Sequence, residues 1–350
     1  MGILCTGSIM LILLFFSSSA MDAALNAASV FVHGVMPALF PMMIISQLMR
    51  PMDVSKRPNG ANLRLLGGNV LFAFAAGSPA STQRTMKMHS DGLLPKPYLL
   101  PMLAAGGVMS PMFFLGTLAG WTGLTHAALI ILLIHWLSAL ITSAVVSSIK
   151  RSRGSDASSR PAFPSSTQGK PPTPPRSILA ALPSAIASSA QSLLCVCGSM
   201  MLFSIIAALI GALLSTAFPL WTASHPKLLA IMWAALEIGG GASALITAYP
   251  APPLTLLCAL CSFGGLSIWM QNLLFIGNSI RPAKLLLIRM LHGAISYGLC
   301  HLLFSIFPLL TETFSQPQAI PAPAQFSAVI PILLIGIAAY PLMRRRFSAS

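Results

Sequence analysis

Long apolar runs with almost no charge constrain this chain more than any other feature. A helix needs about 20 apolar residues to cross the hydrocarbon core of a bilayer. Eight runs are of this kind: 1–20, 24–49, 99–121, 124–149, 193–214, 254–277, 285–309 and 328–343. Only 7% of the residues are charged, whereas soluble domains carry about 25%. The sequence therefore predicts an all-α polytopic membrane protein.

Two further apolar segments are interrupted. Residues 65–80 are broken at Gly77-Ser78-Pro79, and residues 228–248 at Gly239-Gly240-Gly241. If both are re-entrant hairpins, which return to the side they enter, the N-terminus starts inside and almost every Lys and Arg becomes cytoplasmic, Arg289 included. Lys227 is the exception. A full span at the second segment would instead place Arg344 to Arg346 outside. We therefore expect hairpins, with both termini cytoplasmic.

A hydrophilic stretch divides the membrane segments into two halves. Residues 150–176 are rich in Ser, Pro and basic residues and predict a flexible cytoplasmic linker. It separates an N-terminal half, 1–149, with two leading helices and a first repeat, from a C-terminal half, 177–350, with a second repeat and a final helix. Residues 178–214 are too long for one span and contain Pro183, so we expect a kinked or interfacial start. Residues 1–20 lack the basic start of a signal peptide, and we expect them to be retained.

The two halves repeat one order of features. In the first, a hairpin precedes a helix broken at 106–111 and an intact helix ending at Ile149. In the second, a hairpin precedes a helix broken at 263–267 and an intact helix to Leu309. One hairpin enters from inside and the other from outside, as in inverted-repeat transporters, whose broken helices meet near the bilayer midplane. The alternative is that these glycines only permit close helix packing.

Glu237 is the acid that stands inside an apolar run. A carboxylate in hydrocarbon costs about 2.5–3.5 kcal/mol on insertion scales, so it is either hidden or used. One hypothesis is that Glu237 binds a proton or cation and couples transport to an ion gradient. The other is that a hydrogen-bonded Glu237 pins the hairpin tip to a broken helix, for example at Ser267 or Gln271. Both stay open at this point.

Several segments carry a family resemblance. "SFGGLSIWMQNLLFIGNSIRPAKLLLIRMLHG" (262–293), "VMPALFPMMIISQLM" (35–49), "SPMFFLGTLAG" (110–120) and "ALEIGGG" (235–241) resemble, in the same order, the YlbJ family of sporulation integral membrane proteins, which look related to nucleoside-transporter gate domains. Two motifs depart from the family pattern. The first hairpin has "AGSPAS" where an aromatic residue and a second Gly are usual, and "AAGG" replaces the usual Cys-Asn-Asn.

The resemblance implies movement of dipicolinic acid, a small aromatic dianion, during spore formation. It also implies a location in the bacterial cell membrane, namely the mother-cell-derived outer forespore membrane. Backbone amides and small polar side chains at the breaks would bind the carboxylates. The expected substrate-binding residues are Gly77, Ser78, Ser81, Gly106, Gly107, Ser110, Gly264, Gly265, Ser267, Gln271 and Asn272. An ionised Glu237 would repel a dianion, so we assign it no direct substrate contact.

Other classes of function have weaker support. No nucleophile, base and acid form a known motif and no phosphate-binding loop is present, so we expect no enzyme and no cofactor. The basic residues are scattered, which disfavours a nucleic-acid partner. Cys258 and Cys261 lack metal-ligand neighbours in the sequence, and we expect no metal site. His292 is expected at the membrane interface; the alternative is that it titrates or contacts substrate. The alternative function is a non-transporting scaffold for spore maturation.

Overall fold

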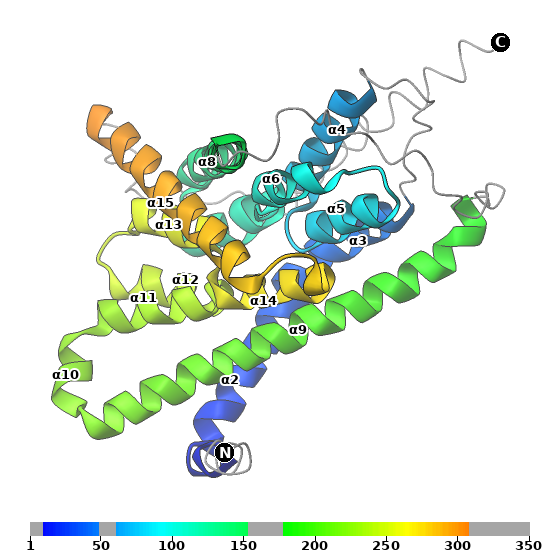
Figure 1. Ribbon diagram of the computed structural model, residues 1–350. Helices are drawn as coiled ribbons and strands as arrows, with labels where there is room; N and C mark the ends of the chain where they lie inside the picture. Colours follow the sequence, from blue (N-terminus) through cyan, green and yellow to red (C-terminus); the bar gives the residue numbers. More distant parts are fainter. Residues whose placement is uncertain (1–9, 49–60, 153–177, 308–350) are drawn as a thin grey trace.

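The computed structural model describes residues 10–48, 61–152 and 178–307, and all regular elements in these ranges are helices (Figure 1). Four helices are long and apolar enough to span a membrane: Thr125–Ile149, Leu179–Ala217, Leu254–Ser279 and Pro282–Ile306. A bent pair, Ser17–Val35 with Leu39–Leu48, would make a fifth span. The all-α membrane class is therefore confirmed. The predicted span 328–343 and the linker after Ser152 lie outside the described residues.

The N-terminal region bends at a different place from the one the sequence predicts: its two helical parts meet at 59° at a break between Val35 and Leu39. It contains α2 (Ser17–Val30), the π-helix η1 (Phe31–Val35) and α3 (Met36–Leu48). The expected boundary between two spans at residues 21–23 is wrong, because it falls within α2. Small residues explain the continuity: Ala20, Ala23 and Ala27 are buried at helical spacing, on a helix that packs against α9 (Ile178–Ala217). Small side chains let membrane helices approach closely.

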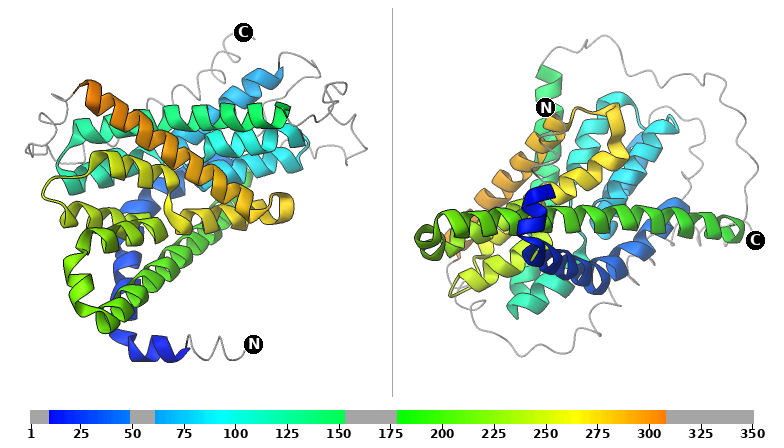
Figure 2. Two further views of the ribbon diagram at one scale, coloured as in Figure 1. Left: turned by 60° about the vertical axis from the view of Figure 1, so that its left-hand side comes forward. Right: turned by 90° about the horizontal axis from the view of Figure 1, so that it is seen from below.

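Helix α9 is one unbroken element of 40 residues. At 1.5 Å per residue it is about 60 Å long, twice the roughly 30 Å hydrocarbon core of a bilayer. Pro183, its sixth residue, does not interrupt the helix, and its missing N–H leaves the Leu179 carbonyl without an intrahelical partner. Figure 1 and the right-hand view of Figure 2 show α9 running across the width of the molecule.

Each half contains a hairpin, a broken helix and an intact helix, in the predicted order. The elements of the first half are α4 (Ala61–Ala76), α5 (Ala80–Ser90), α6 (Lys96–Gly106), the π-helix η2 (Phe113–Leu118), α7 (Ala119–Thr122) and α8 (Thr125–Ser152). Those of the second are α10 (Pro219–Ser224), α11 (Pro226–Leu236), α12 (Ile238–Ala248), α13 (Leu254–Phe263), α14 (Gly265–Ile276), the 3-10 helix η3 (Gly277–Ser279) and α15 (Pro282–Ile306). Helix α6 packs on α8, α13 packs on α15, and α8 packs on α15. The two halves thus use corresponding pairs of helices and join through their intact ones.

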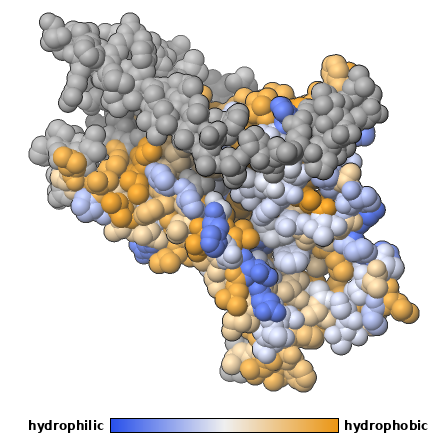
Figure 3. All heavy atoms as spheres, turned by 180° about the vertical axis from the view of Figure 1, so that it is seen from behind, coloured by the Kyte–Doolittle hydropathy of each residue, from blue (hydrophilic) through white to orange (hydrophobic). Residues whose placement is uncertain are grey.

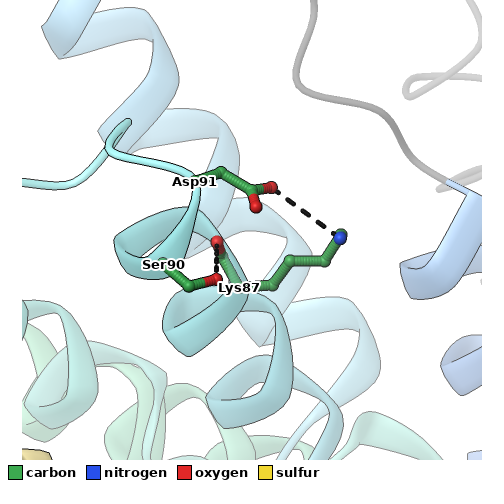
Figure 4. Close-up of polar contacts among 3 residues, drawn as sticks. All are labelled: Lys87, Ser90 and Asp91. Carbon is green, nitrogen blue, oxygen red and sulfur yellow. Dashed lines mark hydrogen bonds and ion pairs between the residues drawn. The ribbon is translucent and has the colours of Figure 1, made fainter. Parts of the chain in front are cut away.

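The hairpin arms are shorter than the hydrocarbon core of a bilayer: α4, the longest, has 16 residues, or about 24 Å, against roughly 30 Å. Helices α5, α11 and α12 have 11 residues each, which is about 16 Å, half the hydrocarbon thickness. The far end of α5 is polar and exposed: Lys87 Nζ lies 3.8 Å from Asp91 Oδ2, and the Ser90 hydroxyl donates to the Lys87 carbonyl (Figure 4). Its other end, at Ala80, is fully buried. Helix α5 therefore leads from a water-compatible end to a tip inside the protein.

The outer surface of the helices is apolar. Leu133 on α8, Leu194 on α9 and Leu287 on α15 are 52%, 72% and 64% exposed. On the face seen in Figure 3, strongly hydrophilic residues form only small patches among hydrophobic and pale ones. Apolar surface this extensive is characteristic of contact with lipid.

Candidate functional site

The tip of the first hairpin lies against the break of the first broken helix. Gly77, at φ +72°, is so close to that break that a Cβ there would lie 2.5 Å from the Ser110 amide nitrogen. The Ser78 amide donates to the Val108 carbonyl at 2.6 Å, and the Ser81 hydroxyl donates to the Gly106 carbonyl at 2.7 Å. The break expected within 106–111 is confirmed: α6 ends at Gly106 and residues 107–110 are non-helical. The hairpin thus satisfies carbonyl groups that the break frees.

A second contact joins this tip to the other half of the chain. Asn272 on α14 accepts two hydrogen bonds at its Oδ1, from the hydroxyls of Ser78 and Thr82, each at 2.7 Å. All three side chains are buried. The sequence predicts Asn272 as a donor to substrate; in the structure its amide oxygen is an acceptor for the first hairpin. Residues 194 positions apart in the sequence, Ser78 and Asn272, therefore meet at one point.

The second hairpin breaks at Glu237, and the expected break at Gly239-Gly240-Gly241 is wrong. These glycines lie within α12, because the Glu237 carboxylate caps that helix: Oε1 accepts from the Gly239 amide and Oε2 from the Gly240 amide, both at 2.7 Å. An acidic side chain at a helix N-terminus is favoured by both the free amides and the dipole. At Gly241 only glycine fits, because a Cβ there would collide with the backbone of Ala234 on α11.

The second hairpin tip lies against the break of the second broken helix, which the structure places at Gly264 between α13 and α14. Gly264 and Gly265 have φ values of +82° and +72°, a conformation that favours glycine. A Cβ on Gly265 would lie 3.1 Å from the Leu236 carbonyl oxygen and 3.3 Å from the Ile238 amide nitrogen, the two neighbours of Glu237. Gln271 donates to Ser267 at 3.1 Å on the same helix, while Glu237 bonds within its own hairpin.

Arg289 connects the two helix breaks, and its expected place among cytoplasmic charges is wrong. It lies on α15, is 2% exposed, and donates from Nε to the Phe263 carbonyl at 2.9 Å and from Nη1 to the Gly107 carbonyl. These carbonyls stand at the C-terminal ends of α13 and α6, where the helix dipole favours a cation. A Cβ on Gly107 or Gly264 would collide with the guanidinium. The two glycines therefore leave the space that Arg289 fills.

The charge of Arg289 is not matched by an acid in the described part of the chain. The acids described there are Asp22, Asp91 and Glu237, and the one ion pair in that part joins Lys87 to Asp91. Within the same ranges, Arg289 Nη2 has no hydrogen-bond partner. A charged side chain at the centre of a membrane helix costs about 2.5–3.5 kcal/mol on insertion scales, so such residues are commonly functional. Two carbonyl groups offset part of this cost and leave a positive charge at the site.

A buried chain of hydrogen bonds gives a second connection between the breaks. His135 on α8 accepts from the Met109 amide at Nε2 (2.9 Å), which leaves Nδ1 to donate to the Ser262 hydroxyl (2.8 Å). Ser262 then donates to Ser296 on α15, at 2.8 Å. All three side chains are fully buried. The first break, at Met109, is thus bonded to the residue before Phe263, at the end of α13.

His292, one turn after Arg289, is 1% exposed, so its expected place at the membrane interface is wrong. Its Nε2 lies 3.0 Å from the His135 carbonyl oxygen, and since a carbonyl only accepts, Nε2 carries the hydrogen. The rings of His135 and His292 stack with centroids 4.9 Å apart. Nδ1 of His292 has no partner among the described residues. Arg289 and His292 therefore place two buried nitrogens without partners three residues apart on one helix.

Most of the predicted site residues meet in one cluster. The first hairpin and the first break bring together Gly77, Ser78, Ser81, Gly106, Gly107 and Ser110, and α14 adds Asn272. Gly264 and Gly265 join through Arg289 and the second hairpin, whereas Ser267 and Gln271 bond to each other. Sequence reasoning missed Arg289, His135 and Thr82. The signal for Arg289 was available, because it stands seven residues inside an apolar helix that begins at Pro282.

The chain matches no protein-family model, no curated protein and no solved structure. Its class rests on its own features: a polytopic α-helical membrane protein in which two hairpin tips and two helix breaks are packed against one another in the interior.

Proposed function

We propose that this protein is a membrane transporter of a small organic anion, built as an inverted repeat with two re-entrant hairpins. The observation that carries the proposal is that the two hairpin tips and the two helix breaks contact one another in a row. The first tip, at Gly77, packs against the first break at Ser110. Arg289 bonds to both breaks, and the second break, at Gly265, packs against the second tip beside Glu237. Non-helical backbone at membrane depth is typical of substrate sites in secondary transporters. Three hairpin arms, α5, α11 and α12, reach about halfway across a bilayer and α4 reaches about 24 Å, and this shortness supports re-entry.

The proposed substrate follows from the charge of the site and from the resemblance to the YlbJ family. Arg289 is a buried cation without an acid partner in the described residues, and the freed amides of a broken helix favour anions. Dipicolinate, a small dianion, has this chemistry. On this proposal the protein acts in the outer forespore membrane, with both termini in the cytoplasm.

The proposed role of Glu237 is coupling to a proton or cation gradient. Its carboxylate is 3% exposed and accepts two amide hydrogen bonds within its own hairpin. Protonation would remove charge from a cap that holds the start of α12, so the bound ion and the shape of the hairpin tip would be linked. The same two bonds also support the second candidate function, a non-transporting scaffold in which Glu237 only caps a helix.

The test is uptake of labelled dipicolinate by proteoliposomes, with and without an imposed proton gradient. We compare the wild type with Glu237→Gln at equal incorporation and equal thermal stability. Gradient-stimulated uptake that Glu237→Gln loses supports a coupled transporter. Equal uptake by both proteins, in the presence and absence of a gradient, contradicts the coupling role. No uptake by correctly inserted wild type favours the scaffold.

A further inference from the structure

Arg289 has one unused hydrogen-bonding nitrogen at the N-terminus of a helix. Nε and Nη1 bond to the carbonyls of Phe263 and Gly107, while Nη2 has no partner among the described residues. Nη2 is the atom nearest to the place a Cβ would take on Gly264, the residue that precedes α14. Helix α14 has 12 residues, so its N-terminal amides carry the full partial charge of a helix dipole. A guanidinium nitrogen and a helix N-terminus thus lie together.

The bonds already made fix the guanidinium without neutralising it. Two carbonyl partners hold the plane of the group, and α6 and α13 both end at it. Carbonyl groups carry no net charge, so the site keeps its full positive charge for a ligand. A guanidinium held in this way presents Nη2 in a fixed direction, whereas a lysine ammonium on its flexible stem would not be held in this geometry.

His292 places a hydrogen-bond acceptor near Arg289. Its Nδ1 is also buried and without a partner among the described residues, and it stands three residues from Arg289, on the same side of α15. The Nε2 hydrogen is committed to the His135 carbonyl. Nδ1 of the neutral ring is therefore an acceptor, which can bond to a protonated carboxyl group but not to an ionised carboxylate, so the contact with the anion is assigned to Arg289 alone.

We propose that Arg289 is the anion-recognition residue of this protein, and that it binds a carboxylate of the substrate through Nη2 beside the N-terminus of α14. This assignment rests on the proposed transport function, and it names the substrate class of the same site: small organic acids with at least one ionised carboxylate. Glycine at positions 107 and 264 is required by the place of the guanidinium between the breaks, whether or not it binds a ligand.

The experiment measures equilibrium binding by the purified full-length protein in detergent, which needs no transport. The probes are dipicolinate, the monocarboxylate picolinate, and the uncharged dimethyl ester of dipicolinate. Variants are Arg289→Gln and Arg289→Lys, with Lys284→Gln as the matched control, because Lys284 is exposed on the same helix and its loss changes the charge equally.

We expect wild type and Lys284→Gln to bind dipicolinate with equal Kd and to show no binding of the dimethyl ester. Arg289→Gln should raise Kd at least tenfold and Arg289→Lys by a smaller factor. Because Arg289 also joins the breaks, each variant's thermal midpoint is measured without ligand, and only folded variants are compared. If Arg289→Gln is too unstable to compare, Arg289→Lys replaces it. The measured quantity is then the ratio of the Kd values for dipicolinate and picolinate, which we expect to differ from that of the wild type.

Two results overturn the inference. One is binding by folded Arg289→Gln with the wild-type Kd, which would leave Arg289 as a purely structural contact. The other is the absence of binding of either acid by folded wild type. Binding that depends on Arg289 without uptake into liposomes would overturn the transport proposal and leave the anion site standing.

Discussion

Replacing Gly77 by alanine tests whether the first hairpin tip is packed against the first helix break. The new Cβ would lie 2.5 Å from the Ser110 nitrogen, 2.9 Å from its Cα and 3.0 Å from the Met109 carbonyl carbon. All three atoms belong to the backbone, so no side-chain rotation relieves the collision. Alanine at a left-handed φ costs about 1–2 kcal/mol, and overpacking adds about 1–3 kcal/mol. We expect Gly77→Ala to lower the free energy of unfolding by about 2–5 kcal/mol.

Gly92 supplies the matched control for this prediction. Its φ of +73° is nearly that of Gly77, but a Cβ there would meet no atom within 4 Å. Gly92→Ala therefore has the conformational cost alone, about 1–2 kcal/mol. The assay is denaturant unfolding of the purified variants in detergent, followed by tryptophan fluorescence. If Gly77→Ala is no more destabilising than Gly92→Ala, the claim that the first hairpin tip packs closely against the first helix break is wrong.

Three further experiments test contacts at the second hairpin and between the breaks. Gly241→Ala should destabilise by about 1–3 kcal/mol through overpacking, while Gly240→Ala, whose nearest contacts are at 3.5 Å, should be close to neutral; equal effects in thermal unfolding would contradict this. Glu237→Ala should cost about 1–3 kcal/mol because the buried Gly239 amide and the part-buried Gly240 amide lose their acceptor, and Glu237→Gln less because one oxygen remains; similar unfolding midpoints for wild type and both variants would refute the cap. In a double-mutant cycle, His135→Ala and Ser262→Ala should couple by about 0.5–1.5 kcal/mol, and strict additivity would exclude their hydrogen bond.

Sequence reasoning predicted the positions where the chain stops being helical better than the contacts made there. The break at Gly106 to Pro111 could be predicted because glycine and proline act locally. The second hairpin was misplaced by a few residues, because a carboxylate that caps a helix is a local bond that glycine content does not reveal. Gly241 is a glycine because α11 packs so closely against α12 at this position that no side chain fits, and this contact forms only on folding.

Arg289 shows why charge counting has a limit. The positive-inside rule assigns basic residues near helix ends to the cytoplasm. Arg289 is seven residues from Pro282, where α15 begins, so the rule counts it among the cytoplasmic charges. Its burial depends on two carbonyl groups, of Gly107 and Phe263, that come together only in the folded protein. The hydrogen bonds of His135 are of the same tertiary kind, since they join residues from separate helices. No spacing in the sequence predicts such contacts.

Side-specific labelling of the second hairpin tests the central claim, re-entry, most directly. Single cysteines at the exposed positions Ser224 and Ala251, just before and after α11 and α12, are exposed to a membrane-impermeant maleimide in intact cells and in inverted vesicles. The parent protein with its native cysteines gives the background. The account predicts that both positions react from the outside only. Reaction of the two positions from opposite sides would show that the segment crosses the membrane and would contradict the account.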